Sequence, residues 1–365
     1  MRQVKIPKLK GQNRYWFVRA GKEAEFCRAF NNSDAVAIGH LDSLLTTQQD
    51  RKYLSADDAS HYRELYKNSK SGKSKSSVSN VAGQIDRFIR DVDCRDILIC
   101  PSNSGYMIGV VNSPAYLCSE TLSSGESMNE SLCSYQLRRD VQWSKMRSKE
   151  TAPLAFARLF KNPSTIFEIT KNRDLIDKWL LPLHIDEHND IVFSCRLTQK
   201  SLISNRDSTK FSLFLDDLEA ASFFISQEIE KRGEFSSEDI AKIISDGHNH
   251  VDYNFKLTTQ QAFMSPGDIF TRLPSDNKLQ AFIFALLISA AFQCEPVFSE
   301  ETEQPKISKL VKQEVFETSR KIAQNNSFNH TKDSLGLAWR NSEEVVFASS
   351  ENTFPEARPS TDTPM

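Results

Sequence analysis

The sequence lacks an apolar run long enough to cross a bilayer, which takes about 20 residues. The most apolar segment, sixteen residues without a charge, runs from Leu279 to Cys294, between Lys278 and Glu295. We predict a buried helix over residues 279–293, with a membrane-disrupting element released by a sensor as the alternative. The basic N-terminus leads directly into YWFV without the apolar core of a secretory signal. These features predict a cytoplasmic protein with no constitutive membrane association.

Patterned cysteines are also missing. The seven cysteines are odd in number and scattered, and none stands in a C-x-x-C spacing. This distribution favours reduced thiols and argues against a disulfide framework or a thiolate zinc site.

Catalytic motifs are absent as well. The chain has no H-E-x-x-H, G-x-S-x-G or G-x-G-x-x-G. The tripeptide Gly72–Ser74 (GKS) resembles a phosphate loop, but Lys67 stands where the first glycine belongs. A metal-dependent nuclease core needs Asp/Glu-x-Lys on a strand, and the candidate Asp276–Lys278 lies in a predicted turn. No enzyme and no cofactor is indicated.

Two histidine clusters leave an enzymatic alternative open. His184 and His188 form one, and the second is made of Asp246, His248, His250 and Asp252. Alternate residues of a strand point to one face, so the second cluster has a geometry that a metal site uses. The alternatives are therefore polar turns or a divergent metal-dependent nuclease or other hydrolase in residues 180–345.

What the sequence does contain is typical of a globular protein with two domains. It has 365 residues, of which 39% are hydrophobic and 26% are charged. The net charge of −2 hides a split: residues 1–180 hold 28 Lys/Arg against 20 Asp/Glu (+8), and residues 181–365 hold 18 against 28 (−10). The first half is therefore the better candidate for contact with a polyanion.

The first half alternates strands and helices. We expect strands at residues 15–19 and 35–39, a hairpin at 97–100 and 106–111, and a strand at 137–143. Apolar residues at helical spacing predict a helix over 81–92, capped by Ser79 or Asn80. The polar stretch 66–80 shows no apolar periodicity and predicts no regular structure.

The second half has a different order of elements. We expect strands at 178–185, 190–197 and 251–257, and helices at 211–231, 236–247, 279–293 and 307–322. The apolar pattern breaks near residues 171–178. The predicted domains are therefore 1–175 and 176–345, followed by a disordered tail at 346–365.

Aromatic and basic residues alternate in the first half, an arrangement typical of a pocket that stacks on a base and holds its phosphates. The candidates are Trp16, Arg19, Gly39, His40, Gln84, Arg87, Arg138, Arg139 and Trp143, with Lys67, Lys70, Lys73 and Lys75 as phosphate contacts. The alternative is that Trp16 and Trp143 are core aromatics and that the lysines lie on a solvated loop.

These elements come in a familiar order. The segments YWFVRAGKEAEFCRAFNNSDAVAIG, NVAGQIDRFIRDVDCRDILICPSNSGYMIGVV and YQLRRDVQWSKM, within about residues 13–170, resemble the N-terminal specificity domain of Mrr-type restriction endonucleases and related antiviral defence proteins. That domain is similar to the EVE and PUA superfamily of small α/β barrels. The resemblance implies recognition of nucleic acid, often DNA with a modified base that is flipped into a pocket of the barrel.

Carried over by position, the resemblance marks Trp16, Arg19, Ala20, Gly21, Gly39, Gly83, Gln84, Arg87, Arg139 and Trp143 as matching residues. His40 stands where relatives often have an aromatic or another residue. The nuclease half of Mrr-type enzymes has no counterpart here.

The expected fold is α+β, with an N-terminal PUA/EVE-like small β-barrel with flanking helices and a second α+β domain. The expected function is that of a nucleic-acid-binding sensor, for modified DNA, in a restriction or antiviral defence system. Base stacking is assigned to Trp16 or Trp143, and phosphate contacts to Arg19, Arg87, Arg139 and the Lys67–Lys75 loop. The acidic domain is expected to form a homo-oligomer or to recruit a separate effector protein.

Overall fold

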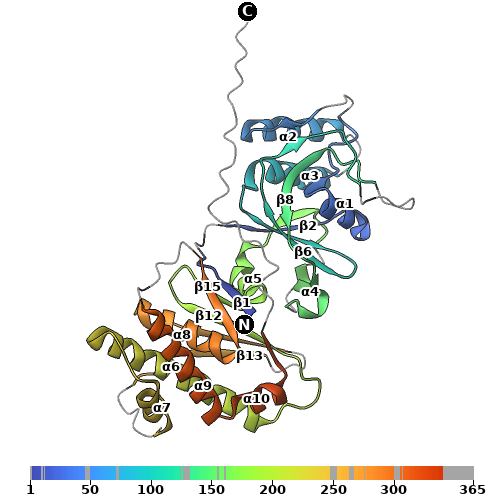
Figure 1. The fold of residues 1–365 in the computed structure, drawn as a ribbon. Helices are drawn as coiled ribbons and strands as arrows, with labels where there is room; N and C mark the ends of the chain where they lie inside the picture. Colours follow the sequence, from blue (N-terminus) through green and yellow to red (C-terminus); the bar gives the residue numbers. More distant parts are fainter. Residues whose placement is uncertain are drawn as a thin grey trace, which may run out of the picture. The chain divides into compact units, whose positions relative to one another are not determined.

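The chain is a mixed α/β protein with 45% helix and 24% strand. The computed structural model (Figure 1) describes residues 2–9, 11, 13–45, 50–70, 74–123, 125, 132–153, 156–159, 162–246, 253–262, 267–274, 276–299, 305 and 307–339. The chain divides into two compact units. Residues 13–170 form one, here called the inserted unit, and residues 1–12 with 171–344 form the other, here called the outer unit.

The inserted unit is built on a curled, half-barrel sheet of nine strands. The main path runs β10-β2-β5-β6-β8-β7-β4, while β3 pairs with β8 and β9 pairs with β6. The strands are β2 (Tyr15–Val18), β3 (Ala35–Ile38), β4 (Lys52–Tyr53), β5 (Ile97–Pro101), β6 (Gly105–Val111), β7 (Tyr116–Leu117), β8 (Leu137–Trp143), β9 (Arg147–Ser148) and β10 (Ile166–Glu168). The predicted hairpin is present as the antiparallel pair β5–β6.

Helices flank this sheet: α1 (Cys27–Asn32), α2 (Ala56–Ser69), α3 (Lys75–Asp86) and α4 (Phe156–Leu159). The polar stretch 66–80 was predicted to lack regular structure, yet α2 reaches Ser69 and α3 begins at Lys75. The physical reason is capping. Ser74 Oγ accepts a hydrogen bond from the Ser77 amide, and Ser55 forms a capping box with Asp58. Ser74, not Ser79 or Asn80, is thus the cap of α3.

The outer unit combines a sheet with a layer of helices. β12 (Ile191–Leu197) is its central strand, and the order is β11-β12-β14-β13 with β16 also paired to β12. The other elements are β11 (Leu183–Ile185), β13 (Thr258–Ala262), β14 (Gly267–Leu273), β16 (Leu337–Trp339), α5 (Arg173–Leu180), α6 (Asn205–Arg232), α7 (Ser237–Ser245), α9 (Lys309–Asn325) and α10 (Phe328–Leu335).

The first strand of the chain belongs to the outer unit. β1 (Arg2–Ile6) pairs in parallel with β15 (Cys294–Phe298), and the Leu9 amide donates to the Ile185 carbonyl at 2.8 Å. Val4 and Ile6 are buried there. The predicted domain 1–175 thus differs from the observed unit, because β1 buries its side chains beside a strand that lies 292 residues further along the chain.

This division changes the charge of the two parts. Residues 13–170 hold 21 Lys/Arg against 18 Asp/Glu, a net charge of +3, and residues 1–12 with 171–344 hold 24 against 27, a net charge of −3. Four of the basic residues that made the first half positive lie before residue 13. The contrast between the two structural units is therefore much weaker than the contrast between the two halves of the sequence.

The apolar stretch near residue 285 forms α8 (Lys278–Ala291). Its residues from Ala281 to Ser289 are buried, and it packs against α6, α9 and β15. No helix in the described part of the chain is both long and apolar enough to span a membrane. The stretch therefore forms a buried helix in the core of the outer unit.

Two predictions in the outer unit were wrong. The segment KWLL was predicted to be a strand, but it ends helix α5, where Ile176, Trp179 and Leu180 share the buried face. Residues 253–257 were predicted to be extended in a strand, whereas the strand β13 begins only at Thr258.

Candidate nucleic-acid interface

The two tryptophans predicted to stack on a base are part of the core. Trp16 is 1% exposed, and its indole nitrogen donates to Asp96 Oδ2 at 2.8 Å. Trp143 is half-buried, and its indole nitrogen donates to the carbonyls of Phe30 and Ala35 at 3.0 and 3.3 Å. The ring of Trp16 therefore lies in the core, where it cannot stack on a base, and the indole N–H of each tryptophan has a partner inside the protein.

Arg139 is also structural. It is 2% exposed, and its guanidinium donates to the carbonyls of Phe88, Ile89 and Ser113 at 2.8–2.9 Å. α3 continues into a π-helical turn, Arg87–Asp91, whose wider winding leaves carbonyls for such a donor. Burial lowers the pKa of Arg139 to about 10, so it remains charged at neutral pH. Arg139, which was predicted to contact phosphate, thus links β8 to this π-helical turn by hydrogen bonds.

Gln84 and His40 are brought together from α3 and from the end of β3. Gln84 is buried, and its side-chain oxygen accepts hydrogen bonds from the amides of Thr165 and Ile166 at 2.6 and 3.2 Å. A side-chain hydrogen bond links Gln84 to His40. Burial lowers the pKa of His40 despite this bond, so the imidazole is neutral at pH 7.

One atom of His40 stands out. Its Nε2 is buried and has no hydrogen-bond partner among the described residues. A neutral imidazole nitrogen can donate or accept one hydrogen bond, and leaving it unmade costs about 1–3 kcal/mol. This nitrogen is therefore a buried polar atom of the site whose hydrogen bond is not made within the described residues.

Arg19 approaches the same backbone segment as Gln84. Its guanidinium donates to the carbonyls of Asn162 and Ser164 at 2.6 and 3.2 Å, and its amide donates to the Thr165 carbonyl at 2.9 Å. Arg19 and Gln84 thus meet at residues 162–166, and His40 joins them through its hydrogen bond to Gln84. We call this group the 162–166 cluster.

Gly39 lies directly beside the cluster. A Cβ at this position would overlap the ring of Tyr135, so only glycine allows the close approach. Tyr135 in turn meets Phe26 edge-to-face, with ring centroids 5.0 Å apart. The backbone that carries His40 therefore lies against the ring of Tyr135, which Phe26 contacts in turn.

The residues predicted to contact phosphates differ in their exposure and in their partners. Lys70 Nζ donates to Ser43 Oγ at 3.3 Å, close in sequence to His40, and Arg87 is half-buried three residues after Gln84. Lys67 pairs with Glu64. Lys75 is exposed at the start of α3. Lys73 lies outside the described residues.

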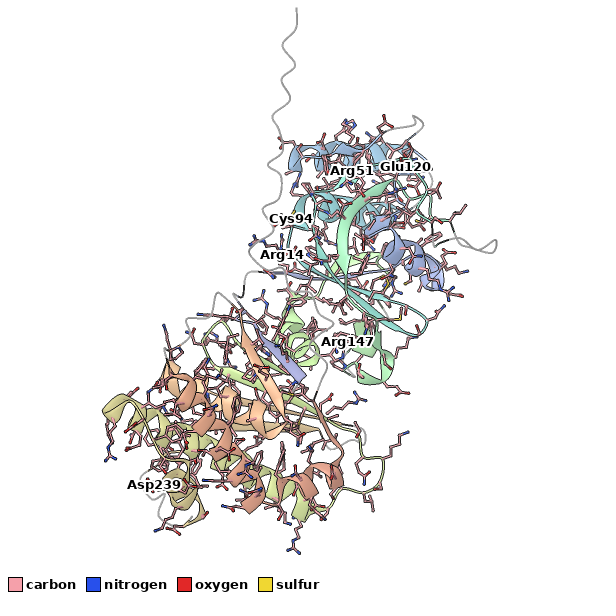
Figure 2. All side chains as sticks on the ribbon, in the orientation of Figure 1. Arg14, Arg51, Cys94, Glu120, Arg147 and Asp239 are labelled. Carbon is pink, nitrogen blue, oxygen red and sulfur yellow. The ribbon has the colours of Figure 1, made fainter. Side chains whose placement is uncertain are left out.

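Sequence reasoning missed a group of aromatic and basic side chains at the edge strand β4, where Figure 2 labels Arg51. The Arg51 guanidinium lies 4.0 Å from the ring centre of Tyr116 and 4.9 Å from that of Tyr53, and it forms an ion pair with Asp140. Tyr53 is 54% exposed. The only sequence signal was the tripeptide Arg51-Lys52-Tyr53, because Tyr116 comes from a distant strand.

No family model, curated protein or solved structure matches this chain.

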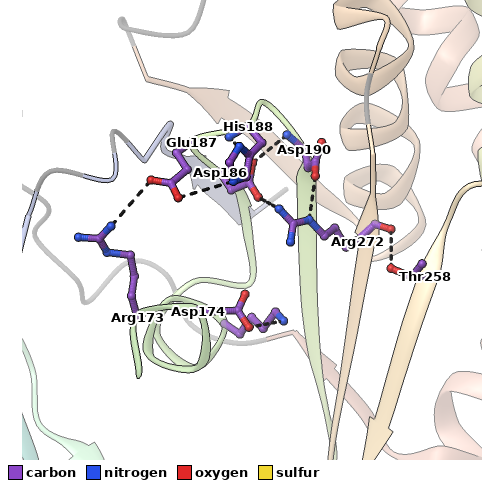
Figure 3. Close-up of polar contacts among 9 residues, drawn as sticks. Arg173, Asp174, Asp186, Glu187, His188, Asp190, Thr258 and Arg272 are labelled. Atoms are coloured by element: carbon purple, nitrogen blue, oxygen red, sulfur yellow. Dashed lines mark hydrogen bonds and ion pairs between the residues drawn. The ribbon is translucent and has the colours of Figure 1, made fainter. Parts of the chain in front are cut away.

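The histidine clusters offer no metal centre within the described residues, where no three Asp, Glu, His or Cys side chains are placed to share an ion. His184 is buried in β11, whereas the side chain of His188 is 68% exposed. Asp186 and Asp190 lie in the turn between β11 and β12, and their carboxylates form ion pairs with Arg272 (Figure 3). His248, His250 and Asp252 lie outside the described residues.

Proposed function

We propose that the inserted unit binds nucleic acid, namely DNA carrying a modified base, and that the chain is the recognition component of a restriction or antiviral defence system. The observation that carries this proposal is the 162–166 cluster. Three residues chosen from the sequence as base or phosphate contacts belong to it, and one of them has an imidazole nitrogen without a hydrogen bond within the described residues.

We further propose that the curled half-barrel sheet is a variant of the EVE/PUA-like barrel. The support is the order of motifs in residues 13–170 together with the mixed sheet and its flanking helices. The tryptophans of those motifs then serve to build the barrel, and the polar residues beside them serve recognition.

Recognition in this proposal is by hydrogen bonding. His40 Nε2 contacts the edge of the base, since its pKa is lowered and the ring is a neutral donor or acceptor. Gln84 fixes the orientation of His40 and is itself fixed by two backbone amides. Lys70 and Arg87 lie on the flanking elements as phosphate contacts, which position the nucleic acid without reading its sequence.

Electrostatic attraction to the DNA phosphates contributes little to the binding that we propose. The inserted unit carries a net charge of +3, which supports only a few phosphate contacts. The logarithm of the affinity for a duplex falls with the logarithm of the salt concentration by about 0.9 per phosphate neutralised. We therefore expect a shallow salt dependence, with a slope of about −2 to −4.

The test is fluorescence anisotropy of the full chain with matched duplexes that contain plain, methylated or hydroxymethylated cytosine, or methylated adenine, at several salt concentrations. His40→Ala is expected to reduce the preference for the recognised base about tenfold, the effect of ~1.4 kcal/mol, and to leave the salt-dependent background. His61→Ala is the matched control, because His61 is exposed on α2 of the same unit. Equal affinity for all duplexes at every salt concentration would refute the modified-base proposal.

A further inference from the structure

We propose that Cys27 and Cys100 form a redox-modified pair, in which a peroxide converts the two thiols into a reversible disulfide between α1 and β5. The two Sγ atoms are 3.9 Å apart, and Cys27 Sγ donates to the carbonyl of Pro101 at 3.1 Å. A disulfide has an S–S distance of about 2.05 Å. The sulfurs therefore have to approach by about 2 Å, through side-chain rotation together with a shift of α1 toward β5.

The two thiols are not equivalent. Cys27 is 5% exposed at the start of α1, whereas Cys100 is fully buried in the sheet. The hydrogen bond from Cys100 lowers the pKa of Cys27, while the same contact and burial raise the pKa of Cys100. Because the thiolate is the nucleophile, Cys27 reacts first and Cys100 resolves the product.

The reaction consumes one peroxide. The Cys27 thiolate attacks one oxygen of hydrogen peroxide, so an S–O bond forms, the O–O bond breaks and hydroxide leaves, which gives a sulfenic acid. The sulfur of Cys100 then attacks the sulfur of Cys27. The S–S bond forms, the S–O bond breaks, and the departing hydroxide takes the proton of Cys100. Two thiols are oxidised by two electrons, and the peroxide is reduced to two waters.

The start of α1 is suited to such a shift. The helix is six residues long, and its cap, Phe26, makes no side-chain capping hydrogen bond. Glu23 and Ala24, just before it, both have positive φ angles, 54° and 63°. A short helix without a cap is held mainly by packing, so a movement of its first turn breaks few hydrogen bonds.

The disulfide acts on the recognition site through two rings. Phe26 precedes Cys27 and contacts Tyr135, and Tyr135 covers Gly39 next to His40. A shift of α1 toward β5 therefore moves the ring that lies against the backbone of His40. This last step, unlike the disulfide itself, rests on the proposed function of the 162–166 cluster.

The first experiment maps disulfides in the full chain. The reduced protein is treated with hydrogen peroxide, the remaining thiols are alkylated, and peptides are mapped by mass spectrometry without reduction. We expect one linked peptide pair that joins Cys27 to Cys100 and that dithiothreitol separates. Cys27→Ser and Cys100→Ser lose this pair. Cys133→Ser keeps it, because burial raises the pKa of Cys133 to about 11 and leaves that thiol unreactive.

Three results would overturn the disulfide: no linked pair, a link to a different cysteine, or oxidation of Cys27 to sulfinic acid without any link. These results come from the wild-type protein, so they do not depend on whether a variant folds.

The second experiment measures hydrogen exchange of residues 35–42 before and after oxidation. A changed exchange rate in wild type but not in Cys27→Ser supports the coupling to His40, and an unchanged rate in both refutes it. Neither measurement uses nucleic acid, so a failure of the proposed function in the His40→Ala binding test remains distinguishable.

Discussion

His184 makes a sharp prediction for the stability of the outer unit. The imidazole is 3% exposed in β11, and burial lowers its pKa to about 3. Asp174 opposes this shift, while Lys178 and Arg272 add to it. Arg272 is itself held by Asp186 and Asp190 (Figure 3), so its charge stays close to the histidine. The native state therefore keeps His184 neutral over the physiological range.

The direction in which the free energy of unfolding changes with pH follows from proton binding. A histidine in the unfolded chain has a pKa of about 6.5 and takes up a proton below that value, while His184 in the folded chain does not until about pH 3. Above pH 6.5 the group has no effect on stability. As the pH falls, it reduces the free energy of unfolding by about 2 kcal/mol at pH 5 and by about 4 kcal/mol at pH 3.

The measurement compares His184→Leu with wild type. Native-state hydrogen exchange of peptides from β11 and β12 reports the opening free energy of the outer unit separately, at about pH 7.5 and about pH 5. Leucine does not titrate, so the loss of stability between the two pH values should be smaller by about 2 kcal/mol. The control is His188→Gln, whose side chain is 68% exposed in the wild type. If all three proteins lose the same free energy, His184 is not buried in a neutral form and the reasoning fails.

Three further predictions concern the inserted unit. Trp16→Ala should lower the free energy of unfolding by about 3–5 kcal/mol in a urea titration, because it removes a buried ring and leaves a buried carboxylate without its indole donor; a neutral variant would show that the ring is accessible. Arg139→Lys should cost about 2–4 kcal/mol in the same assay, since lysine cannot reach all three carbonyls. Tyr53→Ala should weaken binding to the recognised duplex by about 1–3 kcal/mol, and unchanged anisotropy would exclude stacking at β4.

Strong local periodicity made much of the fold predictable. The hairpin β5–β6, the strand β8 and the helices α6 and α8 appear where the sequence pattern placed them. α2 was missed because its stability comes from a capping box and from a few buried tyrosines, not from an apolar stripe. The KWLL segment was assigned to a strand because four residues are too few to separate the two periodicities.

The candidate site was predictable in its members but not in their roles. His40 and Gln84 lie more than forty residues apart, and only the fold shows that they share a hydrogen bond. Trp16 and Arg139 are residue types that are common in nucleic-acid sites. Buried tryptophan and arginine also act as hydrogen-bond donors to a carboxylate or carbonyl inside the protein, as these two do. Composition does not distinguish these uses, because the partner atom belongs to a distant element.

The parallel pairing of β1 with β15 sets an order of events during synthesis. At 5–20 residues per second, β1 leaves the ribosome on the order of 15–60 s before its partner strand exists. During that time the inserted unit is complete in sequence and can fold, whereas Val4 and Ile6 remain without their final neighbours. Closure of the outer unit is thus a late step, which follows the synthesis of residues 13–170 and brings β1 and β15 together. Expression of residues 171–344 alone would omit the strand that completes this step.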